Sequence, residues 1–252
     1  MTPLIRVQNI TVAYGSNVIL KDVSFDVNSG EVFVILGGSG CGKSTLLKNM
    51  IGLLLPASGQ VLIDGEDIVQ SAGEERIELL NRIGVAYQSG ALFGSLTLLE
   101  NVMIPLEEFT DLPREARERL AAMKLKLVAL EGFENYAPSE ISGGMQKRAA
   151  IARAMALDPK ILFLDEPSAG LDPITSADLD QLILYLSKKL GITFVIVTHE
   201  LDSIYTVADR VIMLDKIVKG VIAEGKPKEL KQKSDHAFVR QFFNRETSKE
   251  AL

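Results

Sequence analysis

The residues best suited to chemistry form one glycine-rich run that ends in a lysine and a serine. The run is Gly37-Gly38-Ser39-Gly40-Cys41-Gly42-Lys43-Ser44, and it separates the apolar stretch Val32–Leu36 from a helical pattern that opens at Thr45. Glycines let backbone N–H groups turn toward an anion, and a helix start adds partial positive charge. Lys43 can reach the terminal phosphates of a nucleotide, and Ser44 can ligate Mg²⁺. The spacing predicts a phosphate-binding loop; the alternative is a glycine-rich turn beside an incidental lysine.

A second pair of candidate residues follows another apolar stretch. Ile161–Leu164 runs directly into Asp165 and Glu166. A buried parallel strand delivers the residues at its carboxyl end to the sheet edge where ligands bind. Asp165 therefore suits a Mg²⁺ site, and Glu166 suits a general base that polarises an attacking water. Taken alone the two acids fit an ordinary strand end, but together with the phosphate loop they favour catalysis.

The elements that must position these residues indicate an α/β fold. Residues 5–27 alternate apolar and polar side chains around a turn at 14–17, which predicts an antiparallel hairpin region. Continuous apolar runs separated by helical patterns are typical of a mainly parallel sheet covered by helices. These runs are Val32–Leu36, Ile161–Leu164, Phe194–Val197 and Val211–Leu214.

Helical spacing dominates between Gln88 and Pro159, in Glu100–Pro105, Arg114–Leu130 and Gly144–Leu157. We therefore expect one domain over residues 1–225 with a helical subdomain inserted at about 89–158. A C-terminal helical extension is expected over 226–252. There Phe238, Phe242 and Phe243 give a short apolar stripe between charged residues.

Composition narrows the function classes. The 252 residues are 47% hydrophobic, enough to bury the core of one domain with a subdomain. The net charge of −6 argues against nucleic-acid binding, which needs clustered lysine and arginine. The single Cys41 excludes an internal disulfide and is interpreted as a small residue of the loop. No signal segment opens the sequence and no apolar run approaches the ~18 residues of a membrane span, so we expect a cytoplasmic protein that acts through partners.

A further motif carries a family resemblance. Ile141-Ser142-Gly143-Gly144-Met145-Gln146-Lys147-Arg148 precedes a long helical pattern and resembles the signature motif of ABC ATPases. Other residues follow in the order of that family: Tyr14 resembles its adenine-stacking aromatic, Gln88 its Q-loop glutamine, Ser168–Asp172 its D-loop and His199 its switch histidine. The resemblance covers about residues 5–225 and implies a P-loop NTPase fold of the ABC ATPase cassette type.

The resemblance also implies roles. Glu166, His199 and Gln88 are the expected catalytic residues, with His199 holding the attacking water in line with the γ-phosphate. Ser44, Gln88 and Asp165 are the expected Mg²⁺ ligands. In this family two subunits pair head to tail, so the signature motif of one closes over the ATP held by the other. The expected ATP-binding residues are Tyr14, Gly37, Gly38, Ser39, Gly40, Cys41, Gly42, Lys43, Ser44, Thr45, Ser142, Gly143, Gly144 and Asp172.

Within the family the chain looks most like the Mla-type ATPases. Met145 stands where the common signature has glutamine, and the segment after Gln88 and the tail beyond Gly225 are also similar. This likeness implies phospholipid transport between the inner and outer bacterial membranes, by a homodimer attached peripherally to the cytoplasmic face of the inner membrane. Membrane permeases would bind the Gln88–Val102 region, where Leu92 and Phe93 are either exposed for that contact or packed inside.

A small regulatory subunit and an MCE-type lipid-binding protein are further partners that the likeness implies. The alternatives are an ABC ATPase for another substrate, or a soluble ABC ATPase in assembly or maintenance. The second alternative is disfavoured because the sequence has neither a second cassette nor a long coiled-coil insertion.

Overall fold

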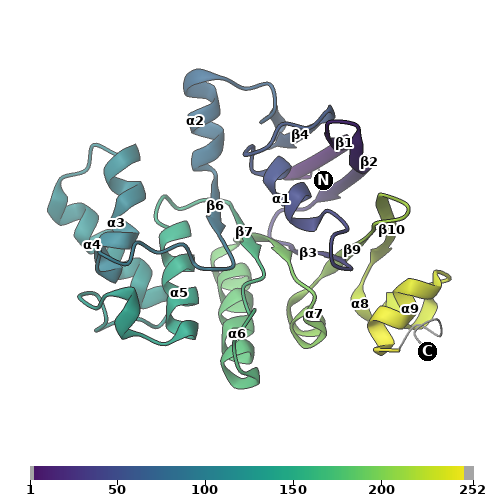
Figure 1. Cartoon of the computed structure of the whole chain (residues 1–252). Coiled ribbons are helices and arrows are strands. Elements are labelled where there is room, and N and C mark those ends of the chain that lie inside the picture. Colours follow the sequence, from purple (N-terminus) through teal and green to yellow (C-terminus); the bar gives the residue numbers. More distant parts are fainter. Residues whose placement is uncertain (1–2, 247–252) are drawn as a thin grey trace. The chain divides into compact units, whose positions relative to one another are not determined.

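The computed structural model describes residues 3–246, and the chain divides into two compact units. The first unit combines the residues up to Leu79 with those from Thr193 onward, and the second consists of Leu80–Ile192. Figure 1 follows the chain through both units. No helix within residues 3–246 has the length and apolar content that crossing a bilayer requires.

The first unit contains an antiparallel sheet and a mainly parallel one. The antiparallel sheet has the order β2-β1-β4-β5, and the other strands of the unit follow the order β10-β9-β3-β8. The strands are β1 (Ile5–Tyr14), β2 (Asn17–Val27), β3 (Val32–Gly37), β4 (Ser58–Ile63), β5 (Glu66–Asp67), β8 (Thr193–Val197), β9 (Arg210–Asp215) and β10 (Gly220–Gly225). The predicted hairpin is confirmed, because β1 pairs antiparallel with β2 and Tyr14 lies opposite Asn17.

Strands β3, β8 and β9 of the mainly parallel sheet correspond to three of the apolar runs that the sequence predicted to be buried on both faces. Every residue of β3 and of β8 is buried, and β3 pairs in parallel with both β8 and β9. The unit's helices are α1 (Lys43–Met50), α7 (Leu201–Val207), α8 (Pro227–Lys233) and α9 (Ala237–Asn244), and α2 (Gly73–Asn81) runs across the boundary to the second unit. Sequence periodicity missed β4, β5 and β10, which lack a clean alternation.

Arg210 joins the ends of several strands in this unit. Its guanidinium donates to both carboxylate oxygens of Glu31, at 2.7 and 2.9 Å, and to the backbone oxygen of Asp26 at 2.6 Å. It also pairs with Glu224 and lies 4.9 Å from the centre of the Phe33 ring. The hydrogen bonds with Glu31 raise the pKa of Arg210 above its usual value. This charge is therefore fixed between β9, β10 and the turn before β3.

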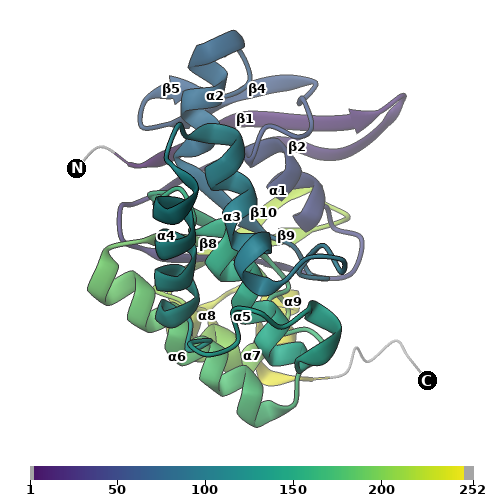
Figure 2. The ribbon, with the colours of Figure 1, turned by 90° about the vertical axis from the view of Figure 1, so that its left-hand side faces the viewer.

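The second unit combines two parallel strands with most of the helices. Strand β6 (Ile83–Ala86) pairs in parallel with β7 (Ile161–Asp165). The helices are α3 (Leu98–Phe109), α4 (Arg114–Leu127), α5 (Gly143–Ala154) and α6 (Pro173–Leu190), with a short 3₁₀ turn at Pro138–Glu140. Figure 2 shows α3, α4 and α5 grouped together. The helices expected from the sequence are present, and Thr97 caps α3 in a capping box with Glu100.

Gly84 permits close packing between β6 and α5. A Cβ at this position would lie 2.1 Å from the backbone oxygen of Ala154 and 2.6 Å from Cδ2 of Leu162. Both distances are far below van der Waals contact, so α5 approaches the strand only because residue 84 has no side chain.

We predict that Gly84→Ala lowers the free energy of unfolding by about 2–3 kcal/mol, because the new methyl group must displace the backbone of α5. Urea unfolding followed by circular dichroism measures this. The matched control is Gly94→Ala, since a Cβ on the exposed Gly94 meets nothing within 4 Å. Equal stability of the two variants would contradict the packing role of Gly84.

Candidate functional site

The predicted phosphate loop joins β3 to α1, and its glycines are required by both backbone angle and space. Gly37 and Gly42 have φ angles of 150° and 102°, which side chains rarely adopt. A Cβ on Gly37 would lie 2.5 Å from the backbone oxygen of Leu214, and one on Gly42 would lie 2.9 Å from Cδ2 of Leu20. The loop therefore lies directly on β9 and β2, which fixes its course.

Lys43 places a positive charge over this loop. Its Nζ donates to the backbone oxygens of Gly37 at 2.9 Å and Gly38 at 3.2 Å. Lys43 also opens α1, and Ser44, next in the helix, is exposed. The ammonium and the start of the helix together suit a phosphate group.

Cys41 is buried inside the loop. Only 2% of its surface is exposed, and burial raises the pKa of its thiol above the usual value. A buried neutral thiol is a poor nucleophile. The structure thus supports the interpretation of Cys41 as a small packing residue.

Tyr14 lies beside the loop. A hollow of about 250 Å³ is lined by Tyr14 and Ile19 on one side and by loop and α1 residues, including Lys43 and Thr45, on the other. Tyr14 is 54% exposed, so its ring is accessible. An accessible ring next to a phosphate loop suits stacking of a purine base.

His199 is at the same edge of the sheet as the loop. Val197, in β8, pairs with Ile35, in β3, in parallel register. Strand β8 ends at this pair, and β3 ends two residues farther along, at Gly37. The exposed His199 therefore lies at the carboxyl edge, where ligands of parallel sheets bind.

In the second unit the register of β6 and β7 brings Gln88 and Glu166 to a common edge. Ala86 pairs with Leu164; β6 ends at this pair and β7 ends one residue later, at Asp165. Burial, and after it the negative charge of Asp165, raises the pKa of the Tyr87 hydroxyl. Glu166 has a φ of 47°, an uncommon left-handed conformation for glutamate that marks a sharp turn at the end of β7.

The signature residues form the start of α5. The Ser142 hydroxyl caps this helix by accepting from the Met145 N–H at 3.3 Å. Gly143 and Gly144 make its first turn, and Gly144 is buried. Gln146, one residue after the methionine, donates to the backbone oxygen of Pro138 at 2.8 Å.

Asp172 begins α6 in a similar way. Its carboxylate accepts from the N–H groups of Ile174 and Thr175, at 3.0 and 3.1 Å, and from the Thr175 hydroxyl at 2.5 Å. The bond from that hydroxyl is the main cause of a lowered pKa of Asp172. A Cβ on Gly144 would lie 2.3 Å from Cγ2 of Thr175, so the first turns of α5 and α6 are in contact.

Three side chains that sequence reasoning missed fix the segment after Gln88. Lys147 donates to the Gln88 backbone oxygen, and Arg153 donates to those of Ala91 and Gly90, at 2.7 and 2.9 Å. Asn101 is fully buried, accepts from the Phe93 N–H at 2.8 Å and donates to the Phe93 oxygen at 3.1 Å. A polar asparagine within an apolar helical pattern is the one signal that predicts such a role.

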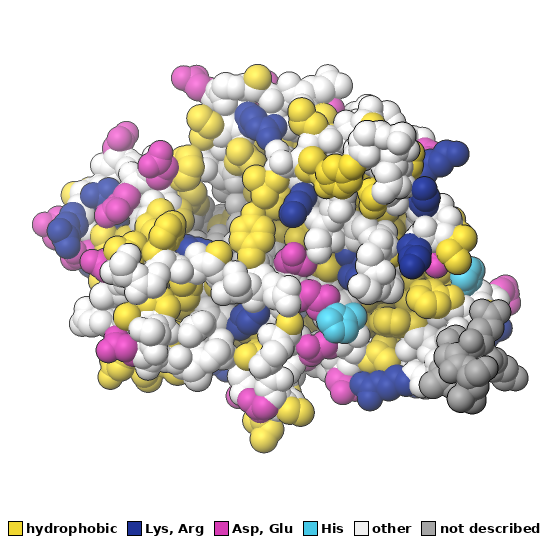
Figure 3. All heavy atoms as spheres, in the orientation of Figure 1, with side chains coloured by type: hydrophobic (Ala, Val, Ile, Leu, Met, Phe, Trp, Pro, Cys, Tyr) yellow, Lys and Arg dark blue, Asp and Glu magenta, His cyan; other side chains and the backbone are white. Residues whose placement is uncertain are grey.

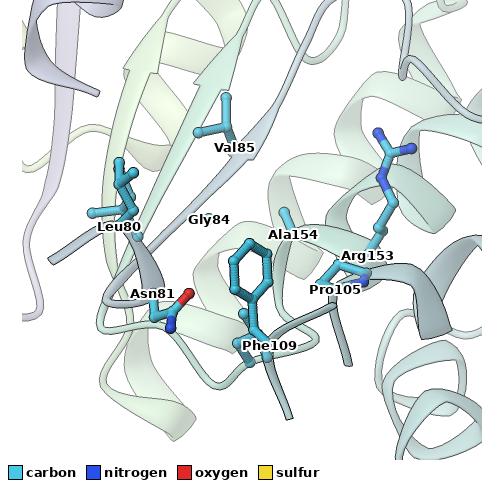
Figure 4. Close-up of a pocket in the computed structure, with 10 residues that line it drawn as sticks. Leu80, Asn81, Gly84, Val85, Pro105, Phe109, Arg153 and Ala154 are labelled. Atoms are coloured by element: carbon cyan, nitrogen blue, oxygen red, sulfur yellow. The ribbon is translucent and has the colours of Figure 1, made fainter. Parts of the chain in front are cut away.

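Beside this segment lies a pocket of about 210 Å³ between β6, α3 and α5. Figure 4 shows the ring of Phe109 pointing into the pocket, toward Gly84 and Ala154. Phe93 is 54% exposed and Phe109 is 49% exposed, whereas Leu92 is half-buried. The sequence left open whether Leu92 and Phe93 are exposed or packed inside. Phe93 is exposed, and Leu92 is intermediate between the two alternatives.

The candidate residues thus fall into two groups, one in each unit. In the first unit Tyr14 lies beside the predicted phosphate loop, and His199 follows a strand at the same sheet edge as that loop. In the second unit Gln88, Asp165 and Glu166 lie at the ends of two paired strands, and the unit also contains the capped starts of α5 and α6. Over residues 3–246 no cluster of three or more His, Cys, Asp or Glu side chains could hold a metal ion. Mg²⁺ needs no such cluster, because it is commonly bound by one or two carboxylates together with substrate phosphates.

Comparison with known proteins gives consistent matches. Residues 20–169 match the ABC transporter family. The chain is 45% identical to the "Probable ribonucleotide transport ATP-binding protein mkl" of Mycobacterium leprae over 95% of this chain and 68% of that protein. It is 40% identical to the "Intermembrane phospholipid transport system ATP-binding protein MlaF" of Haemophilus influenzae over 94% of this chain and 89% of that protein. It therefore spans about two thirds of the mycobacterial relative and most of the second one.

Solved structures agree. CbiO1 of Clostridium perfringens, part of an ABC transporter complex, matches with a TM-score of 0.83 and 32% identity, covering 91% of this chain and 90% of that one. A dimeric ATP-binding cassette in a post-hydrolysis state with ADP and Pi matches with a TM-score of 0.79 and 35% identity, covering 88% of this chain and 98% of that one. The chain therefore belongs to the ABC transporter family and is an ATP-hydrolysing cassette.

Proposed function

We propose that this chain hydrolyses ATP to drive phospholipid transport between the inner and outer membranes of a bacterium. The observation that carries the cargo class is the 40% identity to the intermembrane phospholipid transport protein MlaF, because the match extends over nearly the full length of both chains. The identity to mkl favours a second candidate, a transporter of ribonucleotides. We prefer phospholipid because the match to mkl covers only about two thirds of that protein.

The proposed reaction is attack of water on the γ-phosphate of ATP. Lys43 and the loop N–H groups bind the phosphates, and Tyr14 stacks on the adenine. Glu166 takes a proton from the attacking water, and His199 holds that water in line. Fixed donors matter most in such a reaction, since charge spreads over the oxygens of the transferring phosphoryl group.

Mg²⁺ is the proposed metal. Ser44, Gln88 and Asp165 would hold it through a hydroxyl, an amide and a carboxylate oxygen, and hard oxygen ligands of this kind suit Mg²⁺. When bound, the ion neutralises charge on the β- and γ-phosphates.

The proposed active form is a homodimer. Ser142, Gly143 and Gly144 open α5, which leaves N–H groups of its first turn for the phosphates of ATP bound by the other subunit. Asp172 acts at the same interface. A dimeric cassette among the similar structures supports this arrangement.

The proposed membrane partner is a permease that binds the Gln88–Val102 region. This region presents the exposed Phe93, and the half-exposed Phe109 lines the adjoining pocket. Figure 3 shows hydrophobic side chains at the surface where α3 and α4 lie. We further propose attachment to the cytoplasmic face of the inner membrane, a small regulatory subunit, an MCE-type lipid-binding protein as a further partner, and no nucleic-acid partner.

Lys43→Ala should weaken ATP binding by about 10- to 100-fold, since a hydrogen bond to a charged group contributes roughly 1.5–3 kcal/mol. Equilibrium titration with a fluorescent ATP analogue measures the Kd. Lys48→Ala is the matched control, because Lys48 is an exposed lysine later in the same helix. An unchanged Kd in Lys43→Ala would reject the assignment of the loop.

Glu166→Gln should retain ATP binding but lower kcat by about 10²- to 10⁴-fold, because the amide keeps the shape of the side chain but is a far weaker base. Phosphate release measures kcat, and the same titration reports binding. Glu115→Gln changes an exposed glutamate of the same unit and should leave both unaltered. Wild-type turnover in Glu166→Gln would show that another group is the base.

The cargo is tested by purifying the tagged protein from its native membrane in mild detergent and identifying proteins and lipids by mass spectrometry. We expect a permease, a lipid-binding protein and phospholipid. Phe93→Asp should lose them, because a charge replaces an exposed apolar contact, while ATP binding persists. Tyr185→Asp alters a similarly exposed aromatic residue of α6 and should keep them. Nucleotide in place of lipid would favour the second candidate, and soluble partners alone would reject a transport role.

A further inference from the structure

Helix α9 lies against two elements that lead into the candidate site. Figure 1 shows α8 and α9 packed together toward the C-terminal end of the described chain, and Figure 3 shows hydrophobic side chains gathered over α7 and α9. These two elements are the phosphate loop and α7, and both belong to the same unit as α9. Neither the position of α9 beside the loop nor its contact with α7 is part of the reaction proposed above.

The first contact is with the phosphate loop. Cζ of Phe238 lies 3.7 Å from the position that a Cβ on Gly38 would occupy, which is ordinary van der Waals contact. Gly38 is central to the loop, because its backbone oxygen accepts from both Lys43 Nζ at 3.2 Å and the Cys41 N–H at 3.3 Å. The Phe238 ring therefore lies next to the residue that orients the phosphate-binding lysine, with room for a methyl group between them.

The second contact is with α7, which begins directly after His199 and Glu200. The Tyr205 hydroxyl donates to the backbone oxygen of Phe243 at 3.3 Å, and the two rings lie 6.0 Å apart. Arg245, which ends α9, pairs with Asp202 of α7 at 3.6 Å. One short helix thus lies beside the loop and contacts the helix that follows the candidate switch histidine.

The anchoring of α9 is distinct from its contact with the loop. Val239 and Phe243 are buried and attach the helix to its unit, whereas Phe238 is half-buried. Arg240 fixes the start of α9 by donating to the backbone oxygen of Ser234 at 2.6 Å. Removing the Phe238 ring should therefore release the loop while α9 stays in place.

We propose that Phe238 is a positioning residue for ATP binding, and that the location of α9 sets the affinity of the phosphate loop. The ring restricts Gly38, so the Gly38 carbonyl and Lys43 are already arranged when phosphate arrives. Ordering the loop in advance lowers the entropy lost on binding. The proposal depends on ATP binding at Lys43 and is independent of the transported cargo.

The test compares three full-length variants by ATP-analogue titration and thermal unfolding. Phe238→Ala should weaken ATP binding by about 3- to 10-fold, the range typical of residues that act through a neighbour. Phe238→Leu keeps apolar contact and should retain most of the affinity. Phe242→Ala is the matched control, since Phe242 is a half-buried phenylalanine of the same helix that packs edge-on against Phe243. Phe242→Ala should lower Tm about as much as Phe238→Ala does, but it should leave the Kd for the ATP analogue unchanged.

The wild-type protein gives a second measurement that does not depend on the folding of a variant. Coupling is reciprocal, so ATP should slow amide hydrogen exchange in residues 237–244 as well as in the loop. Equal affinity losses in Phe238→Ala and Phe242→Ala would overturn the proposal, as would loop protection without protection of α9. Failure of the assigned ATP site would instead appear as an unchanged Kd in Lys43→Ala.

Discussion

Parallel strands in register deliver their carboxyl ends to one edge of a sheet, and the candidate catalytic residues follow from this geometry. Ile35 pairs with Val197, so the phosphate loop and His199 emerge together; Ala86 pairs with Leu164, so Gln88 and Glu166 do the same. Backbone hydrogen bonds between the paired strands hold each register. The positions of the candidate catalytic residues therefore depend on strands that consist mostly of buried apolar residues.

Several polar residues near the site also stabilise local structure. Ser142 and Asp172 cap α5 and α6, and contact between Gly144 and Thr175 brings the starts of these helices together. A cap satisfies N–H groups that would otherwise lack partners, so changing one of these residues affects stability as well as any contact with nucleotide. Activity alone cannot separate the two roles, and binding and unfolding have to be measured together.

The segment after Gln88 combines a rigid backbone with exposed rings. Asn101 and Arg153 bond its backbone oxygens, which leaves Phe93 projecting from a fixed support. A rigid, partly apolar surface loses little entropy when a partner binds. Near the C-terminal end of the described residues, α9 places Phe238 beside the phosphate loop. Two features, the proposed permease-binding surface and the phosphate loop, thus each lie next to side chains that take no part in hydrolysis.

Much of this protein can be predicted from sequence alone. The glycine spacing from Gly37 to Ser44, the acids after Ile161–Leu164 and the apolar runs specify an α/β nucleotide-binding fold, because these signals are local and each has a direct physical cause. The short strands β5 and β6, the backbone contacts of Asn101 and Arg153, and the position of Phe238 beside Gly38 were decided only by the tertiary structure. Each depends on packing or hydrogen bonds that no local pattern records. Residues 38 and 238 lie far apart along the chain, and only the folding of α9 onto its own unit brings them close together.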